Sequence, residues 1–163
     1  MDNLIREKTY VNILLDTLVK KSRLLDELIA LTKNQQEEFK QEVLDDIKFS
    51  ELLKKKDDIL HQLNQLEEGF ELLYQKVGQE LILHKLEYEK EIRKMQEIIP
   101  CITEKSVQLK SLEVDNKQRL GVYLRNERLK VKEFKANRQA ASNYYRSMAN
   151  LQTGESYFMD QKK

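Results

Sequence analysis

The sequence has little of what interrupts a helix or fills a deep interior. Its 163 residues include four glycines, one proline and no tryptophan. Glycine and proline are the residues least compatible with a helix interior, so their scarcity predicts long helices joined by few turns. Only 7% of the residues are aromatic and 35% are charged. This composition favours an elongated protein with a narrow core and argues against a large enclosed active-site pocket.

Three further absences bear on where the protein acts. The single cysteine, Cys101, leaves no intramolecular disulfide to form. No stretch approaches the roughly 20 apolar residues that a membrane-spanning helix needs. The N-terminus also lacks the apolar run of a signal peptide. We therefore expect a cytoplasmic protein that does not insert into a membrane.

An apolar stripe in residues 52–77 predicts the helix around which the chain is organised. Its members advance by seven once and then by alternating steps of four and three: Leu52, Ile59, Leu63, Leu66, Phe70, Leu73 and Val77. This spacing places them on one side of a helix that must pack against other helices. Lys56 is the defect in the stripe. We expect its ammonium group either to reach solvent along its stem or to lie where the bundle has opened.

Helical spacing extends over most of the chain. We expect a first helix over residues 3 to about 36, a connection before Asp46, and a second helix from about 47 to about 83. Asp45 or Asp46 can cap the second helix. A third helix is expected from about residue 86 to about 148, with Pro100 kinking it or, less favoured, starting a new helix.

These elements predict an all-α fold. We expect an elongated antiparallel coiled-coil bundle of about three long helices, formed by residues 1–148. Residues 149–163 lose helical periodicity and contain Gly154, which predicts a flexible C-terminal tail.

The stripe of the third helix becomes polar toward its C-terminal end. Ile102, Leu109 and Leu120 share it with polar residues, namely Ser106, Glu113, Asn116, Glu127 and Lys130. We therefore expect the distal part of this helix to protrude or to be covered by another molecule. Glu113 and Asn116 are three residues apart and predict a structural polar seam that fixes the register of the helices. Alternatively, both side chains face water from the edge of the stripe.

Apolar residues near the C-terminus are candidates for partner binding. Tyr144, Tyr145, Met148 and Leu151 have helical spacing, and Tyr157, Phe158 and Met159 form a cluster without a local partner. These seven residues can accept a partner helix. Alternatively, Tyr144, Met148 and Leu151 fold back onto the bundle, and Phe158 fills a gap at its end.

Charge is unevenly distributed. Residues 117–163 hold 11 Lys or Arg and 4 Asp or Glu, a balance of +7, whereas residues 1–116 hold 18 and 24, a balance of −6. Acidic residues interrupt the basic run, and no nucleic-acid-binding motif accompanies it. A solvated charged face is therefore favoured, and we expect no nucleic-acid partner.

No pattern indicates catalysis or a bound cofactor. His61 and His84 lack metal-ligand spacing to each other or to Cys101, and we expect Cys101 to be a small packed residue. The Glu-x-x-His motif of di-iron bundles and a glycine-rich phosphate loop are both absent. We therefore expect neither an enzyme nor a metal site.

Two blocks of sequence resemble the FlgN family of flagellar export chaperones. The first is the run from Phe49 to Leu60 followed by Leu66, Glu67, Glu68, Gly69 and Phe70. The second contains Leu112, Glu113, Asn116 and Leu120, then a basic helix and Tyr144 and Tyr145.

The resemblance implies a cytoplasmic chaperone of type III export. Such a protein binds hook-filament junction (hook-associated) proteins through its C-terminal region and delivers them to the export gate. It would be a monomer or small homo-oligomer. The alternative is a structural scaffold that completes its coiled coil by self-association.

Overall fold

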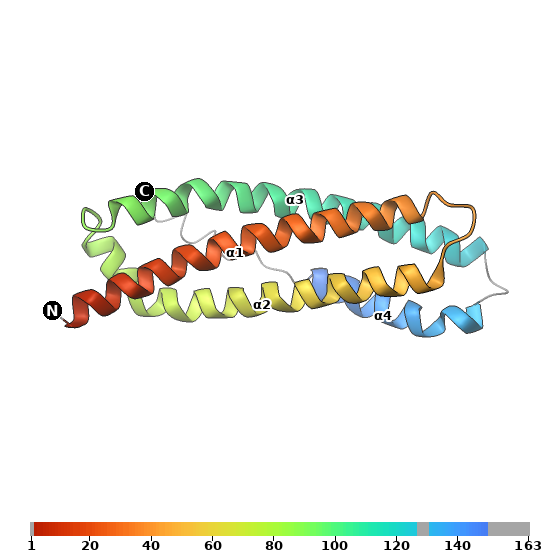
Figure 1. The fold of residues 1–163 in the computed structure, drawn as a ribbon, viewed down its shortest axis with the longest axis horizontal. Helices are drawn as coiled ribbons and strands as arrows, with labels where there is room; N and C mark the ends of the chain where they lie inside the picture. Colours follow the sequence, from red (N-terminus) through yellow and green to blue (C-terminus); the bar gives the residue numbers. More distant parts are fainter. Residues whose placement is uncertain (1, 127–130, 150–163) are drawn as a thin grey trace.

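The structure is a computed structural model that describes the backbone of residues 2–126 and 131–149 and the side chains of residues 6–125 and 138–149. The described chain forms four helices: α1 (Asp2–Glu38), α2 (Asp46–Leu83), α3 (Glu89–Asn126) and α4 (Val131–Ala149). They run alternately up and down along one long axis (Figure 1). The predicted all-α bundle with three long helices is therefore confirmed. The tail beyond Ala149 lies outside the described residues.

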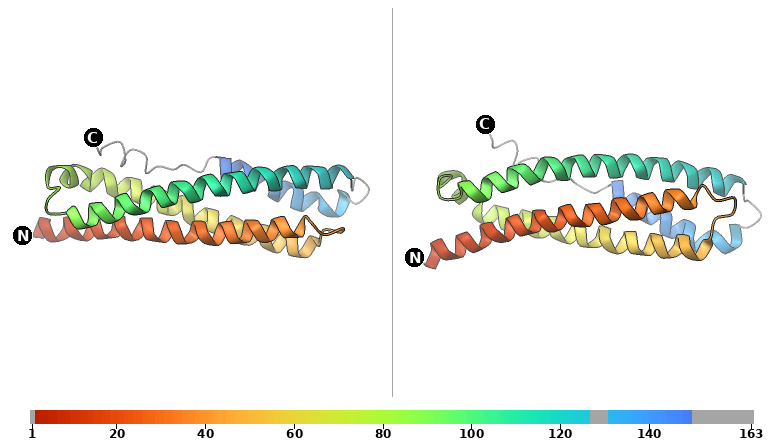
Figure 2. Two further views of the ribbon diagram at one scale, coloured as in Figure 1. Left: turned by 90° about the horizontal axis from the view of Figure 1, so that it is seen from above. Right: turned by 45° about the horizontal axis from the view of Figure 1, so that its top comes forward.

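The fourth helix divides the bundle into two unlike halves. α1 packs along both α2 and α3, whereas α4 packs against α2 and α3 only near the α1–α2 loop. Figure 2 shows α4 diagonally across the bundle from α1. With 19 residues, α4 has half the length of α2 or α3, which have 38 each. The half near the α1–α2 loop therefore contains four described helices, and the other half contains three.

The predicted stripe of α2 lies in the core. Leu52, Ile59, Leu63, Phe70 and Val77 are buried, and Leu66 and Leu73 are half-buried. The buried face is wider than the stripe, because Leu53, Leu60 and Leu81 are also enclosed. α2 needs this width because it packs against α1 and, near the α1–α2 loop, also against α4.

The α1–α2 connection is held at both of its ends. Phe39 packs edge-on against Phe49 of α2, with ring centroids 5.9 Å apart. Leu44 is buried in the same region. Asp45 then caps α2 as expected, because its carboxylate accepts hydrogen bonds from the backbone N–H groups of Ile47 and Lys48 at 3.1 and 3.2 Å. These contacts fix where the chain reverses direction.

The prediction of one third helix reaching residue 148 is wrong. α3 ends at Asn126, and α4 runs back along the bundle. A single helix of that length would have left Ala141, Tyr144 and Met148 facing water beyond the bundle. Reversal of the chain buries all three against the other helices. Burial of these apolar side chains is the physical reason why α4 runs antiparallel to α3.

Pro100 lies inside α3, which continues through it. The alternative in which a new helix begins at this proline is therefore wrong. The neighbouring side chains explain why the helix tolerates the missing hydrogen bond: Ile99 and Ile102 are buried, while Pro100 faces outward. Packing of the apolar face on either side of the proline holds the helix together across it.

Candidate functional site

A buried polar cluster joins all four helices in the four-helix half of the bundle. At its centre, the Lys56 ammonium group of α2 lies 2.6 Å from Oε1 of Glu113 on α3. Lys56 is fully buried and Glu113 is 3% exposed. Lys56 also donates a hydrogen bond of 2.7 Å to Oε1 of Gln35 on α1. Two opposite charges are thus enclosed together, and each compensates part of the other's loss of hydration.

The α4 contribution to the cluster is Tyr144. Its hydroxyl donates a 2.7 Å hydrogen bond to Oε1 of Glu113, and its ring lies 4.5 Å from the Lys56 ammonium group. A cation over an aromatic face is attracted to the ring quadrupole. Tyr144 therefore contacts both members of the ion pair, and it closes the cluster from the α4 side.

Side chains of α1 and α3 complete the cluster. The Thr32 hydroxyl lies 3.0 Å from Glu113 Oε1 and 2.7 Å from the carbonyl oxygen of Leu28, and its one proton serves one of these acceptors at a time. The Asn116 amide donates to the Thr32 carbonyl oxygen at 3.0 Å and to Gln35 Oε1 at 3.3 Å. These bonds connect α1 to α3 at one axial position and oppose sliding of the helices past each other.

The cluster is incompletely satisfied. Three donors converge on Glu113 Oε1, while Glu113 Oε2, Gln35 Nε2 and Asn116 Oδ1 have no hydrogen-bond partner among the described residues. Unpaired buried polar atoms are costly. The cluster is therefore a weak source of net stability and a strong determinant of which helices meet, and in what register.

Burial changes the protonation chemistry of two cluster residues. It lowers the pKa of the Lys56 ammonium group, and the nearby Glu113 carboxylate opposes that shift. Burial raises the pKa of the Tyr144 phenol, and the negative charge of Glu113 and its hydrogen bond act in the same direction. The Glu113 carboxylate thus favours both a charged Lys56 and a neutral Tyr144.

Two predictions about this region are corrected by the cluster. Lys56 neither reaches solvent nor lies in an opened part of the bundle, because Glu113 and Gln35 receive its ammonium group inside the core. Ser106, Glu113 and Asn116 are buried by the chain's own helices, so the polar part of α3 up to Asn116 neither protrudes nor needs another molecule to cover it. Glu127 and Lys130 lie outside the described side chains.

The predicted partner-binding residues separate into three groups. Tyr144 and Met148 are buried at 1% and 4% exposure, so the expectation that they form a free docking face is wrong. They fold back onto the bundle, as the alternative proposed. Tyr145 is half-buried and lines an open groove between α3 and α4. The remaining four lie outside the described residues: Leu151, Tyr157, Phe158 and Met159.

The roles of Thr32 and Gln35 were missed in the sequence. The sequence predicts a first helix to about residue 36, and α1 ends at Glu38, but it was not predicted that polar side chains near this end enter the core. The signal was present in the spacing: Leu25, Leu28, Thr32 and Gln35 advance by three, four and three, and all are buried. Polar residues that continue an apolar stripe indicated a buried polar layer.

The groove beside Tyr145 has a volume of about 410 Å³. Two further grooves lie between α1 and α2. One is lined by Lys20, Arg23, Leu24, Glu27, Gln62, Gln65 and Leu66. The other is lined by Glu27, Ala30, Leu31, Lys55, Asp58 and Ile59. Both α1–α2 grooves carry charges of both signs, whereas the charged residues described in the α3–α4 groove are all basic.

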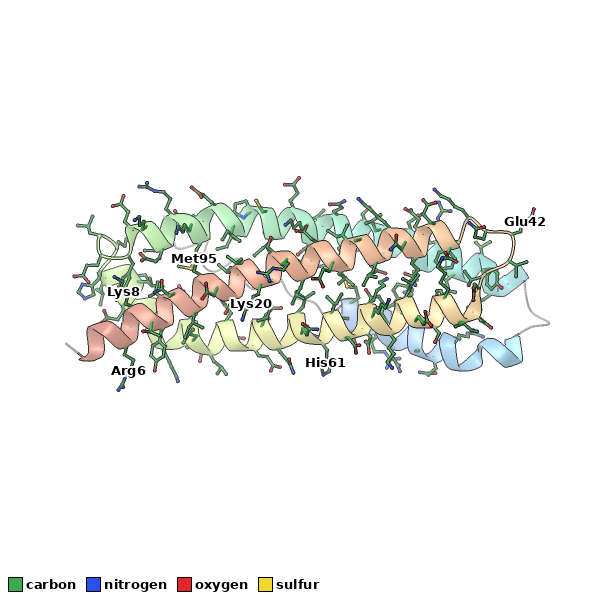
Figure 3. The ribbon with its side chains drawn as sticks, in the orientation of Figure 1. Arg6, Lys8, Lys20, Glu42, His61 and Met95 are labelled. Carbon is green, nitrogen blue, oxygen red and sulfur yellow. The ribbon has the colours of Figure 1, made fainter. Side chains whose placement is uncertain are left out.

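The two histidines and the single cysteine are all exposed. His61 is exposed and points away from the bundle (Figure 3), and His84 is also exposed. Cys101 is exposed, contrary to the expectation that it is packed. Within the described residues there is no group of three or more His, Cys, Asp or Glu side chains that can hold a metal ion. None of the described helices is long and apolar enough to cross a membrane.

Comparison of the chain with models of known protein families, with curated proteins and with solved structures finds no match.

Proposed function

We propose that this protein is a non-enzymatic, cytoplasmic chaperone of flagellar type III export, similar to the FlgN family. In this proposal it binds an amphipathic helix of a hook-associated client and delivers the client to the export gate. The structural observation that carries the binding part is the open groove between α3 and α4, whose floor is apolar. The flagellar part rests on the two resembling blocks of sequence.

The position of the second block supports the proposal. Glu113 and Asn116 belong to that block, and both bind partners in other helices inside the bundle. Tyr144, from the end of the same block, completes the cluster. A polar layer that fixes α4 against α3 also fixes the shape of the groove between them, and a preformed groove binds with less loss of conformational entropy.

The tail is the second element of the proposed binding region. Leu151, Tyr157, Phe158 and Met159 remain candidates for client contact, and they follow α4 directly in the sequence. Tyr145 is the candidate within the described residues, because it lines the groove. Tyr144 and Met148 are assigned to the core instead.

Co-purification with purified hook-associated proteins tests the proposal. We expect the full chain to retain such a client on a size-exclusion column. Deletion of residues 149–163 is expected to leave far-UV helicity and melting nearly unchanged while abolishing the complex. Failure of the full chain to bind any hook-associated protein would contradict the flagellar assignment, and a large fall in melting temperature on truncation would assign the tail to the fold.

A self-associating scaffold is the second candidate function. Ile82, Leu83 and Leu86 are exposed at the α2–α3 turn, at 43%, 75% and 88%, and such an apolar tip favours contact between copies. In contrast, the stripe of α2 is already buried by the chain's own helices. Sedimentation analysis separates the candidates, because a scaffold should form larger species as its concentration rises, whereas the chaperone should remain a monomer or small oligomer.

A further inference from the structure

The α3–α4 groove combines an apolar floor with a basic rim. Leu120 and Ala141 are buried beneath it, and Leu124 and Tyr145 are half-buried along its walls. Lys117, Arg138 and Arg146 lie exposed at its edges. Its described lining residues are Lys117, Leu120, Gly121, Leu124, Arg138, Ala141, Ser142, Tyr145, Arg146 and Ala149. None of these residues is acidic, so the described part of the groove presents one sign of charge around an apolar centre.

The small residues of the groove keep it open. Gly121 faces it from α3, and a Cβ atom added there would meet no heavy atom within 4 Å. Ala141, Ser142 and Ala149 line it from α4. Longer side chains at these positions would fill the space between the helices. The groove therefore has room for side chains supplied by another molecule.

Tyr145 lines the groove with its ring, while its hydroxyl group lies below the surface. Its hydroxyl oxygen is buried and has no hydrogen-bond partner within the described part of the chain. Burial raises the pKa of this phenol, and the Glu113 charge adds to the effect, so at neutral pH the hydroxyl is a hydrogen-bond donor. The Lys117 ammonium group lies 6.0 Å from the centroid of the same ring. A carboxylate entering the groove would meet this exposed ammonium group beside the Tyr145 ring.

We propose that the α3–α4 groove is the docking site for an acidic amphipathic helix, an inference that rests on the proposed chaperone function and names the surface and the chemistry of the client. Apolar side chains of that helix pack against Leu124 and Tyr145. Its carboxylates face Lys117, Arg138 and Arg146. Helix-in-groove recognition of this kind requires an apolar stripe flanked by charge, which matches an apolar floor inside a basic rim.

The apolar floor distinguishes this partner from a nucleic acid. A phosphate backbone would satisfy the basic rim, but it carries no apolar side chain for Leu120 and Leu124. Binding to a nucleic acid would also depend steeply on salt, because it releases condensed counterions. An acidic helix retains the apolar part of its binding energy at high salt.

A designed peptide tests the groove without any natural client. The probe is a fluorescent peptide of about 18 residues, with leucines at helical spacing flanked by glutamates; its control replaces every glutamate by lysine. We expect the full-length protein to bind the acidic peptide in fluorescence anisotropy, about tenfold more tightly than the basic one, at about 0.1 M salt. Equal binding of both peptides, or tighter binding of a DNA duplex of matched length, would overturn the proposal.

Substitutions locate the site. Lys117→Glu and Arg138→Glu are each expected to weaken binding of the acidic peptide about tenfold. Lys20→Glu makes the same charge change beside an α1–α2 groove and is the matched control, for which we expect less than a twofold change. Equal losses in all three variants would show attraction to net charge alone and would refute a specific groove.

A filling variant separates loss of the groove from loss of the fold. Gly121→Leu places a side chain in the open space beside Gly121 and replaces a helix-weakening residue. We expect its melting temperature to be unchanged or higher while peptide binding falls at least tenfold. Wild-type affinity in a folded Gly121→Leu protein would contradict the proposal.

The two proposals fail in different ways. Peptide binding that depends on the groove, together with no binding to hook-associated proteins, would support the groove and contradict the flagellar assignment. Binding of a hook-associated client that is unaffected by Gly121→Leu and Arg138→Glu would support the chaperone function and place its site elsewhere, which would overturn this inference.

Discussion

The Lys56 ammonium group and the Glu113 carboxylate meet 2.6 Å apart inside a helical bundle, closed off from solvent by side chains of all four helices. Removal of one charge leaves the other buried without its counterion. We expect Lys56→Met or Glu113→Leu alone to lower the free energy of unfolding by about 3–5 kcal/mol. Urea denaturation followed by far-UV circular dichroism measures this change.

The double variant Lys56→Met/Glu113→Leu is the control for the pair. It removes both charges, so we expect it to lose clearly less stability than the sum of the single variants. Some loss should remain, because the Tyr144 hydroxyl and the Gln35 amide also lose partners. Strict additivity would show that the two charges do not interact.

Tyr144→Phe removes one hydroxyl and keeps the ring over Lys56. Because the lost hydrogen bond is to a charged acceptor, we expect a destabilisation of about 1.5–3 kcal/mol. Tyr145→Phe is the matched comparison one residue away, since its hydroxyl has no partner among the described residues. That variant should be nearly neutral in thermal melting, and equal losses at both positions would contradict the hydrogen-bond assignment.

Stability should depend on alkaline pH through Tyr144. Its pKa in the folded protein is raised by burial and by Glu113, so the stabilisation linked to its protonated form is complete below the unfolded value of about 10 and is lost as pH rises above it. We expect the free energy of unfolding to fall between about pH 10 and 11.5, and less steeply in Tyr144→Phe. Lys56 opposes this trend, because its lowered pKa favours folding as pH rises.

Two glycines within α2 offer a matched pair for helix stability. A Cβ atom at Gly69 would have open space, whereas one at Gly78 would lie 3.1 Å from the ring of Tyr74. Gly69→Ala should therefore raise stability by about 1 kcal/mol. Gly78→Ala should gain less or lose stability, because the tyrosine ring must move. A larger gain in melting temperature at position 78 than at 69 would contradict this packing.

The helical periodicity of the sequence predicted well which residues enter the core. It predicted less well which helices those residues contact. Leu63, Phe70 and Val77 are buried as the stripe of α2 requires, because helical spacing is a local property of the sequence. Lys56 lies on the same stripe, but its partner Glu113 is on another helix, and no local pattern joins the two. Because burying an unpaired charge is costly, Lys56 was wrongly expected to be exposed.

The other wrong prediction was that the third helix continues to about residue 148. The spacing of Tyr144 and Met148 indicated an apolar face, but spacing alone did not reveal whether this chain or a partner covers it. The groove is equally hidden in the sequence, because Gly121 and Arg138 become neighbours only after the chain reverses. Charge balance predicted a basic C-terminal third, yet the three-dimensional arrangement gathers the basic side chains around an apolar centre.

The half-length of α4 makes local unfolding unequal along the molecule. α1 contacts both α2 and α3 along the bundle, whereas α4 rests on only one end of the α2–α3 pair. Undocking of α4 therefore requires fewer contacts to break than separation of the long helices. Amide hydrogens of α4 should exchange with deuterium through this smaller opening, and those near Leu25 and Leu63 only through global unfolding.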